Sequence, residues 1–225
     1  GFTWGVPSSG TAKVLGSEVP DGTAFLTLYY NIPDEATVKS IAEANGLELK
    51  HNDEYGAYYE FPLVFEREKL NNKKGKLLEW GGLNNSKVKA TYVDSSICIP
   101  VTGVEPTTTT ATTTTDQTTT TTTNQAIDGP AMKINDGNDI VVTPEQEYAE
   151  IPLNLYNVPD TEGITVAFKT DNEGAATLAL LNANSDTYQS YDAVDAFVNL
   201  GKWEENPKGF TWGVPSSGTA KVLGS

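Results

Sequence analysis

This chain contains very little of the residues on which most catalytic and metal sites depend. Its 225 residues include one Cys, one His and one Met. That count leaves no disulfide framework, no cysteine metal site and few options for an imidazole metal site. Basic residues are also scarce, because 15 Lys and Arg stand against 30 Asp and Glu and give a formal charge of −15. Such a surface repels nucleic acid and anionic membranes, and it lacks the basic stripe of a nucleic-acid binder.

The chemistry-bearing side chains that remain are dispersed. His51, in the loop-like run LKHNDEYG, is expected to be solvated, and Cys98 is far from it in sequence, which disfavours a nucleophile–histidine pair. Acidic residues gather in NDGND, TDNEG and HNDEYG, where Asp and Asn favour turns, and no cluster matches the twelve-residue calcium loop. A paired-carboxylate glycosidase site is the enzymatic alternative. The sequence therefore predicts no enzyme, no cofactor and no metal site in this chain. A signal peptide, a transmembrane run and a sorting motif are also lacking, as expected of a fragment from inside a longer chain.

A long stretch of sequence occurs twice. The residues GFTWGVPSSGTAKVLGS occupy both 1–17 and 209–225. An identity of this length indicates one period of a tandem array cut in mid-module, or a circular permutation. A single module would then have one place for this strand and two identical copies to fill it. We expect one copy to fill that place, and the other to stay unpaired or to enter a neighbouring molecule by strand exchange.

The boundary between modules is expected in the middle of the chain. Residues 103–125 are rich in Thr, with too few apolar side chains to repay the entropy of ordering. This composition is typical of an O-glycosylated stalk, with an unmodified flexible spacer as the alternative. We therefore expect residues 1–102 to be the C-terminal part of a module, 103–125 to be a linker and 126–225 to be the N-terminal part of the next. Read from Ala126, the unique residues suffice for one domain.

Hydrophobic patterning predicts an all-β fold of about nine strands with one or two short helices. The clearest helix is Asp34–Asn45, which Asp34 caps and Gly46 ends. A second is expected within 185–201, where large residues recur every third position. In 163–171, Ile164, Val166 and Phe168 are expected on the inner face, and Thr165, Ala167 and Lys169 on the outer face. The expected strands lie within 140–142, 150–158, 163–171, 176–184, 208–214 with its copy at 2–6, 219–224, 25–30, 55–68 and 87–101.

Several of these pieces, in this order, resemble a cohesin, the receptor module of cellulosome scaffoldins. They are LYNVPDTEGITVAF, DGTAFLTLYY, the closing KATYVDSSICI and the Thr-rich linker, and the helix at 34–45 lies where type II cohesins carry one. The resemblance implies a nine-stranded jelly-roll β-sandwich. It implies a non-catalytic scaffold module that binds dockerin-bearing enzymes or scaffoldins in a complex that degrades plant cell-wall polysaccharides. Calcium would be carried by the dockerin. The location would be extracellular, secreted or attached to the cell surface through the parent protein.

The resemblance also implies a partner-binding face, made of strands three, five, six and eight of one sheet. Strand three is GITVAFKTD, strand six is FTWGV in either copy, and the region of strand eight lies around 66–70. The residues expected to contact the partner are Thr165, Ala167, Lys169, Thr3, Gly5, Val6, Thr211, Gly213, Val214, Arg67 and Leu70.

Two other functions remain open. A carbohydrate-binding β-sandwich would stack sugar rings on exposed aromatic side chains, for which Tyr58, Tyr59, Trp80 and Trp203 are the candidates. A structural cell-surface or adhesin repeat would only space out a glycosylated stalk. Trp4 and its copy Trp212 are expected in the core, since each shares a strand face with a Phe.

Overall fold

A computed structural model describes residues 2–5, 16–17, 19–67, 78–102, 128–143, 146, 148–168, 174–182, 194–197, 210–213 and 220–223. For the strands at 2–5, 194–197, 210–213 and 220–223, the description covers the backbone. The linker 103–125, along with the predicted contact residues Val6, Leu70, Lys169 and Val214, lies outside the described residues.

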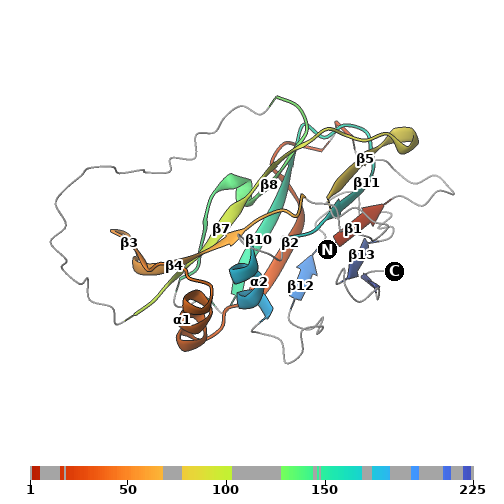
Figure 1. Cartoon of the computed structure of the whole chain (residues 1–225). Helices are drawn as coiled ribbons and strands as arrows, with labels where there is room; N and C mark the ends of the chain where they lie inside the picture. The colour runs from red at the N-terminus through yellow and green to blue at the C-terminus, as the bar shows by residue number, and fades with distance from the viewer. Residues whose placement is uncertain are drawn as a thin grey trace.

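The described residues are mostly β-strand, with two α-helices and two single-turn 3₁₀ helices (Figure 1). The strands before the linker are β1 (Phe2–Gly5), β2 (Thr23–Asn31), β3 (Lys50–Asn52), β4 (Gly56–Leu63), β5 (Glu79–Gly82), β6 (Thr91–Val93) and β7 (Ser95–Pro100). Those after it are β8 (Ala131–Ile134), β9 (Ile140–Val141), β10 (Tyr148–Tyr156), β11 (Thr161–Val166), β12 (Val194–Phe197), β13 (Phe210–Gly213) and β14 (Ala220–Leu223). The helices are α1 (Glu35–Ala44), η1 (Leu83–Asn85), η2 (Asn135–Gly137) and α2 (Ala175–Asn182).

Strands from the two sides of the linker are interleaved in three sheets. Sheet A has the order β14-β13-β1-β11-β5, sheet B the order β12-β2-β10-β8-β6, and sheet C the order β3-β4-β7-β9. The longest pairing joins β2 to β10, which run antiparallel with Leu28 opposite Ile151 (Figure 1). Neither segment completes a sheet by itself, so residues before and after the linker form one folded unit. The predicted β-rich class is confirmed, although the described part of the chain holds fourteen strands in mixed sheets.

Two pairings in the structure are parallel. β6 pairs with β8, with Thr91 opposite Ala131, and β7 pairs with β9, with Ile97 opposite Ile140. β8 and β9 are the first strands after the linker, whereas β6 and β7 are the last strands before it. The segments directly before and directly after the linker are therefore neighbours, once in sheet B and once in sheet C.

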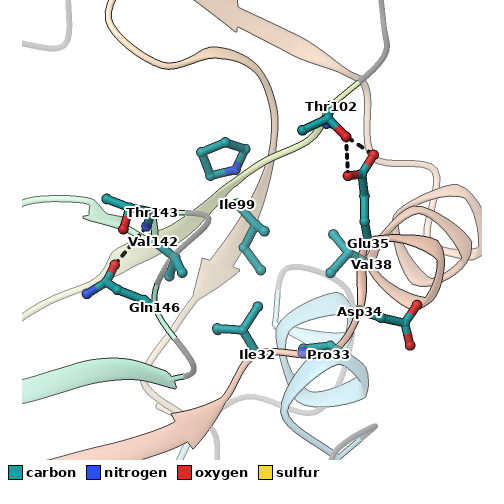
Figure 2. A pocket seen from close by; sticks show the side chains of 11 residues that line it. Ile32, Pro33, Asp34, Glu35, Val38, Ile99, Thr102, Val142, Thr143 and Gln146 are labelled. Carbon is teal, nitrogen blue, oxygen red and sulfur yellow. Dashed lines mark hydrogen bonds between the residues drawn. The ribbon is translucent and has the colours of Figure 1, made fainter.

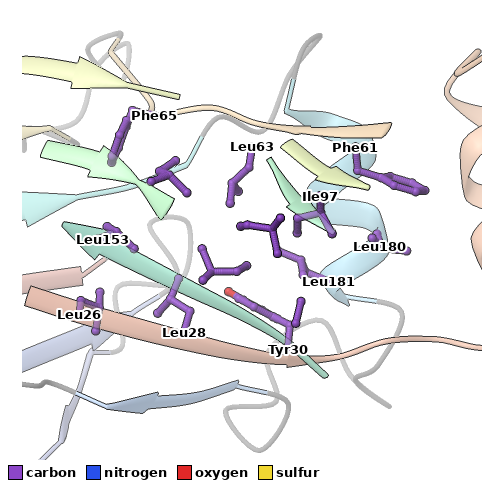
Figure 3. Packing of buried hydrophobic residues seen from close by; sticks show 14 of the residues in the cluster. Leu26, Leu28, Tyr30, Phe61, Leu63, Phe65, Ile97, Leu153, Leu180 and Leu181 are labelled. Atoms are coloured by element: carbon purple, nitrogen blue, oxygen red, sulfur yellow. The ribbon is translucent and has the colours of Figure 1, made fainter. Parts of the chain in front are cut away.

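A single hydrophobic core lies between the sheets and α2 (Figure 3). β4 alternates strictly between buried and half-exposed residues, which puts Phe61 and Leu63 into this core. β2 supplies Leu28 from the other side, and β10 supplies Leu153 beside it (Figure 3). Burying one such side chain contributes about 1.5–3 kcal/mol to folding. The core therefore depends on residues from both sides of the linker.

The predicted helix at 34–45 is confirmed at both ends. The Asp34 carboxylate accepts a hydrogen bond from the Thr37 backbone N–H at 2.9 Å, which satisfies a first-turn donor. At the other end Gly46 has φ 68°, the left-handed conformation that favours glycine. The Leu47 N–H then reaches the Ala42 carbonyl at 2.9 Å, as in a Schellman motif. Local sequence alone therefore defines the bounds of α1.

In contrast to the helix at 34–45, two secondary-structure predictions are wrong. The run 176–184, predicted as a strand, is α2 over Ala175–Asn182, because it is rich in Ala and Leu and has one β-branched residue, Thr177. The Thr177 hydroxyl donates to the Pro62 carbonyl of β4, which joins the helix to sheet C. Within 185–201, predicted as a helix, Val194–Phe197 form β12, where Val194 pairs with Tyr30 of β2. The rest of that range lies outside the described residues.

Candidate partner-binding face

Five of the residues predicted to bind a partner lie on strands of sheet A, namely Thr165, Thr3, Gly5, Thr211 and Gly213. β11 lies between β1 and β5, with Thr165 opposite Thr3 on one side and opposite Glu79 on the other. Thr3 in turn pairs with Thr211 of β13. Four positions, three of them predicted from sequence, thus form one row across four neighbouring strands.

Thr165 and Glu79, the members of this row whose side chains are described, lie on the side of the sheet that faces away from the core. Ile164 and Val166 are buried, and Thr165 between them is half-buried. β5 shows the same alternation, because Trp80 is buried while Glu79 is half-buried. Thr165 was predicted to face outward, and this alternation confirms it.

A row of glycines lies two residues from the threonine row on each strand. Gly163 of β11 pairs with Gly5 of β1 and with Gly81 of β5. Positions two apart in a strand share a face. Glycine has no side chain, so this part of sheet A presents its backbone directly. This face of sheet A therefore carries a threonine and glutamate row beside a glycine row.

Ala167 does not belong to this face. It was predicted to point outward, but it is 3% exposed. The reason is that β11 ends at Val166, and the chain then turns to meet another segment. The Ala167 carbonyl accepts a hydrogen bond from the Glu66 N–H at 2.7 Å, and Phe168 stacks on Phe65 with ring centroids 6.0 Å apart. The strict alternation assumed from sequence breaks at this turn.

Arg67 is exposed, but it is held by other groups. Its guanidinium forms an ion pair with Asp94 at 2.8 Å and donates to the Tyr92 carbonyl at 2.9 Å. Asp94 also accepts from the Phe65 N–H at 2.9 Å. Arg67 therefore fixes the corner between β6 and β7, and it lies outside the strands that carry the threonine row.

Sequence reasoning missed the contribution of β5. Glu79 and Gly81 lie between the expected strands within 55–68 and 87–101, where no strand was expected. The run Glu79–Gly82 has no β-branched residue and ends in two glycines, so its sequence carries little strand signal. Pairing with β11 makes it a strand, and that pairing is non-local.

The three candidate aromatic side chains that the structure describes, Tyr58, Tyr59 and Trp80, do not form the exposed platform that sugar stacking requires. Trp80 is 1% exposed and donates through Nε1 to Thr161 Oγ1 at 2.7 Å. Tyr59 is also buried, and Tyr58 is half-buried with its ring 5.0 Å from that of Tyr55 in an edge contact. The prediction of an exposed platform is therefore wrong for Tyr59 and Trp80. Trp203 lies outside the described residues.

A hollow of about 450 Å³ opens beside the start of α1 (Figure 2). Apolar side chains such as Ile32 and Val142 line it, and the Glu35 carboxylate lies at its rim. Hydrogen bonds from Lys39 and Thr102 lower the pKa of Glu35 to about 2. Glu35 is thus an ionised structural group that joins α1 to the end of β7, and it is poorly suited to exchange protons.

The remaining chemistry-bearing groups have structural roles. Among the described residues, no group of three His, Cys, Asp or Glu is placed to hold a metal ion. The predicted turn in NDGND is confirmed, with Asp136 at φ 56° and its carboxylate accepting from the Tyr156 hydroxyl at 2.6 Å. His51 is exposed as predicted, although it lies on β3 instead of in a loop. Cys98 is buried, and burial raises the pKa of its thiol to about 12, which keeps it protonated.

No family model, no curated protein and no solved structure matches this chain. None of the helices within the described ranges is long and apolar enough to cross a membrane. What the chain does is therefore inferred from its fold and from the exposed face of sheet A.

Proposed function

We propose that this chain is a non-catalytic scaffold module that binds dockerin domains and so assembles a complex that degrades plant cell walls. The observation that carries the proposal is the pair of parallel contacts, β6 with β8 and β7 with β9. The resemblance to cohesins implies that the first and last strands of the module lie side by side. Read from the linker, β8 and β9 are the first strands and β6 and β7 the last, and they are neighbours.

The arrangement of sheet A also supports the proposal. The resemblance assigns strands three and six to the binding face, and these are β11 and either β1 or its copy β13. β11 pairs directly with β1, which brings Thr3 opposite Thr165. Two segments that are far apart in the sequence thus supply adjacent positions on one face, as the proposed binding surface needs.

The finer fold assignment belongs to the same proposal. We propose that the three sheets are parts of a jelly-roll sandwich whose layers enclose the common core, with α1 as the type II-like helical insertion. α1 follows β2 and precedes β4, and Val38 and Ala42 on its inner side are buried. The Thr-rich linker fits a location outside the cell, where such a module would be displayed by its parent protein.

The experiment that tests the function is a calorimetric titration of the whole chain with dockerin domains of both classes, in calcium and in excess chelator. We expect stoichiometric binding to at least one dockerin in calcium and none in chelator, because the calcium belongs to the dockerin. A sedimentation profile and a circular dichroism spectrum recorded on the same sample establish that the chain is folded. Absence of heat with every dockerin, from a folded chain, would contradict the proposal.

A further inference from the structure

The duplicated strand pairs with its own copy. β1 and β13 have the same sequence, FTWG, and run antiparallel, with Thr3 opposite Thr211. On either side of this central pair, Phe2 lies opposite Trp212 and Trp4 lies opposite Phe210. A rotation by 180° about an axis through the threonine pair exchanges the two strands. The pairing is thus symmetric in sequence as well as in direction.

Symmetry of this kind has a consequence for association between molecules. In an interface with twofold symmetry, both partners use the same surface. Residue i of the first partner then contacts residue j of the second, and residue j of the first contacts residue i of the second. The β1–β13 pair already meets that condition within one chain. We propose that FTWG is a self-pairing strand, whose intermolecular partner is the same strand of a second copy of this chain, joined about a twofold axis through Thr3.

The order of sheet A shows why β1 needs such a partner. β11 pairs with one edge of β1, and β13 pairs with the other. Without β13, β1 would be an edge strand with a row of unpaired backbone donors and acceptors, which is a template for another strand. Within one chain, β13 occupies this edge of β1. If β13 leaves the sheet, the β1 strand of a second molecule can pair with the same edge.

The residue types at the interface favour the same register. This register places Phe opposite Trp on both sides of the threonine pair, a combination of residue types that is favourable across antiparallel strands in general. A shift by one residue would place Thr opposite an aromatic residue and move each strand's alternate positions to the other face. One register is therefore preferred for the strand against itself.

This inference goes beyond dockerin binding and stands without it. If both hold, two molecules would join their sheets A into one continuous sheet, and the rows that carry Thr165 would lie on both sides of the axis. The test is accordingly one of self-association, in which no dockerin is present.

The test uses the full chain with Thr211→Pro. Proline lacks the N–H that a central strand needs, so β13 should leave β1 and expose its edge. We expect the unaltered chain to be monomeric by sedimentation, and the Thr211→Pro chain to form a dimer whose fraction rises with concentration. Thr211→Val is the matched control, because valine favours strands and should keep the chain monomeric. A folded Thr211→Pro chain that stays monomeric at every concentration would overturn the proposal.

Single cysteines test the register of that dimer. Residues directly opposite in an antiparallel pair are close enough for a disulfide. Since Thr3 meets its own copy on the axis, Thr3→Cys in the Thr211→Pro chain should cross-link under oxidation. Phe2→Cys in the same background should not, because its opposite residue is Trp4, whereas a mixture of Phe2→Cys and Trp4→Cys chains should. Cross-linking of Phe2→Cys alone as efficiently as Thr3→Cys would contradict the proposed axis.

A second route avoids proline, should that variant fail to fold. Glycine weakens a strand without removing a backbone N–H, so Phe210→Gly with Trp212→Gly should loosen β13 from β1. Thr3→Cys in this background should cross-link to its own copy on oxidation. Phe2→Cys in the same background is the register control, and the background without an added cysteine, with its buried Cys98, is the background control. A folded Thr3→Cys chain that does not cross-link would overturn the proposal.

Discussion

Trp80 donates a hydrogen bond from its indole Nε1 to the hydroxyl of Thr161 at 2.7 Å, and both residues are buried. The Thr161 hydroxyl in turn donates a hydrogen bond to the Pro159 carbonyl, also at 2.7 Å. Trp80 precedes the Thr-rich linker and Thr161 follows it. The bond therefore fastens β5 to β11 and stabilises the edge of sheet A on which Glu79 lies.

Replacing Thr161 with valine should destabilise the chain. Valine has a similar shape but no hydroxyl, so the Trp80 N–H would be buried without an acceptor, at a cost of about 1–3 kcal/mol. Urea unfolding followed by tryptophan fluorescence measures the change in the free energy of unfolding. Thr91→Val, at an exposed position of β6, is the control and should change it far less. An equal decrease in the free energy of unfolding for Thr161→Val and Thr91→Val would show that the Trp80–Thr161 hydrogen bond does not contribute to stability.

The lowered pKa of Glu35 predicts that the free energy of unfolding depends slightly on pH in the acid range. Its pKa is lowered to about 2 in the folded chain, first by the Lys39 hydrogen bond and then by Thr102, from an ordinary value of 4.5. The stabilisation is therefore complete above about pH 4.5 and is lost as the pH falls toward 2. Because both side chains of the Glu35–Lys39 pair are about a third exposed, solvent screening limits this stabilisation to below about 1 kcal/mol.

Glu35→Gln tests this dependence. The variant should be less stable than the unaltered chain at pH 7, and the difference should shrink between pH 4.5 and pH 2. Thermal unfolding across that range measures it, with Glu43→Gln, at an exposed position of the same helix, as the control. A difference that stays constant with pH would mean that the Glu35 charge has no part in it.

Cutting the linker should leave the molecule in one piece. All three sheets take strands from both sides of residues 103–125, and the core does too. A protease site placed within 108–122 and then cleaved should give two fragments that migrate together in size-exclusion chromatography. They should separate only in denaturant. Fragments that separate in native buffer would contradict the single folded unit.

The elements that sequence predicted well are those defined by local signals. α1 has a capping aspartate, an inward face with Val38 and Ala42, and a terminal glycine, and all of these act within a few residues of each other. β2 likewise carries β-branched and aromatic residues, and β4 carries three aromatic residues, both in strand-like order. The helix α2 was missed because its short run of Ala and Leu fits a buried strand and a buried helix equally well, and its packing against β4 and α1 decides between them.

The residues of the candidate face were predicted only in part, because some of them depend on contacts between distant segments. The resemblance placed Thr3 and Thr165 on one sheet, and the register brings them opposite each other. It could not indicate Glu79 or Gly81, since β5 becomes a strand only by pairing with a distant segment. Ala167 was placed wrongly because alternation was extended past the end of β11, where the chain turns toward Glu66. Both errors concern long-range contacts that periodicity does not encode.

The most direct test of dockerin binding through sheet A is a calorimetric titration of Thr165→Arg, in calcium, with a dockerin that binds the unaltered chain. A long charged side chain at the centre of the face should weaken binding about tenfold or more, as at an interface hot spot. Ser40→Arg adds the same group to the exposed side of α1 and should bind like the unaltered chain. Equal affinity of Thr165→Arg and Ser40→Arg would contradict a binding site on this face.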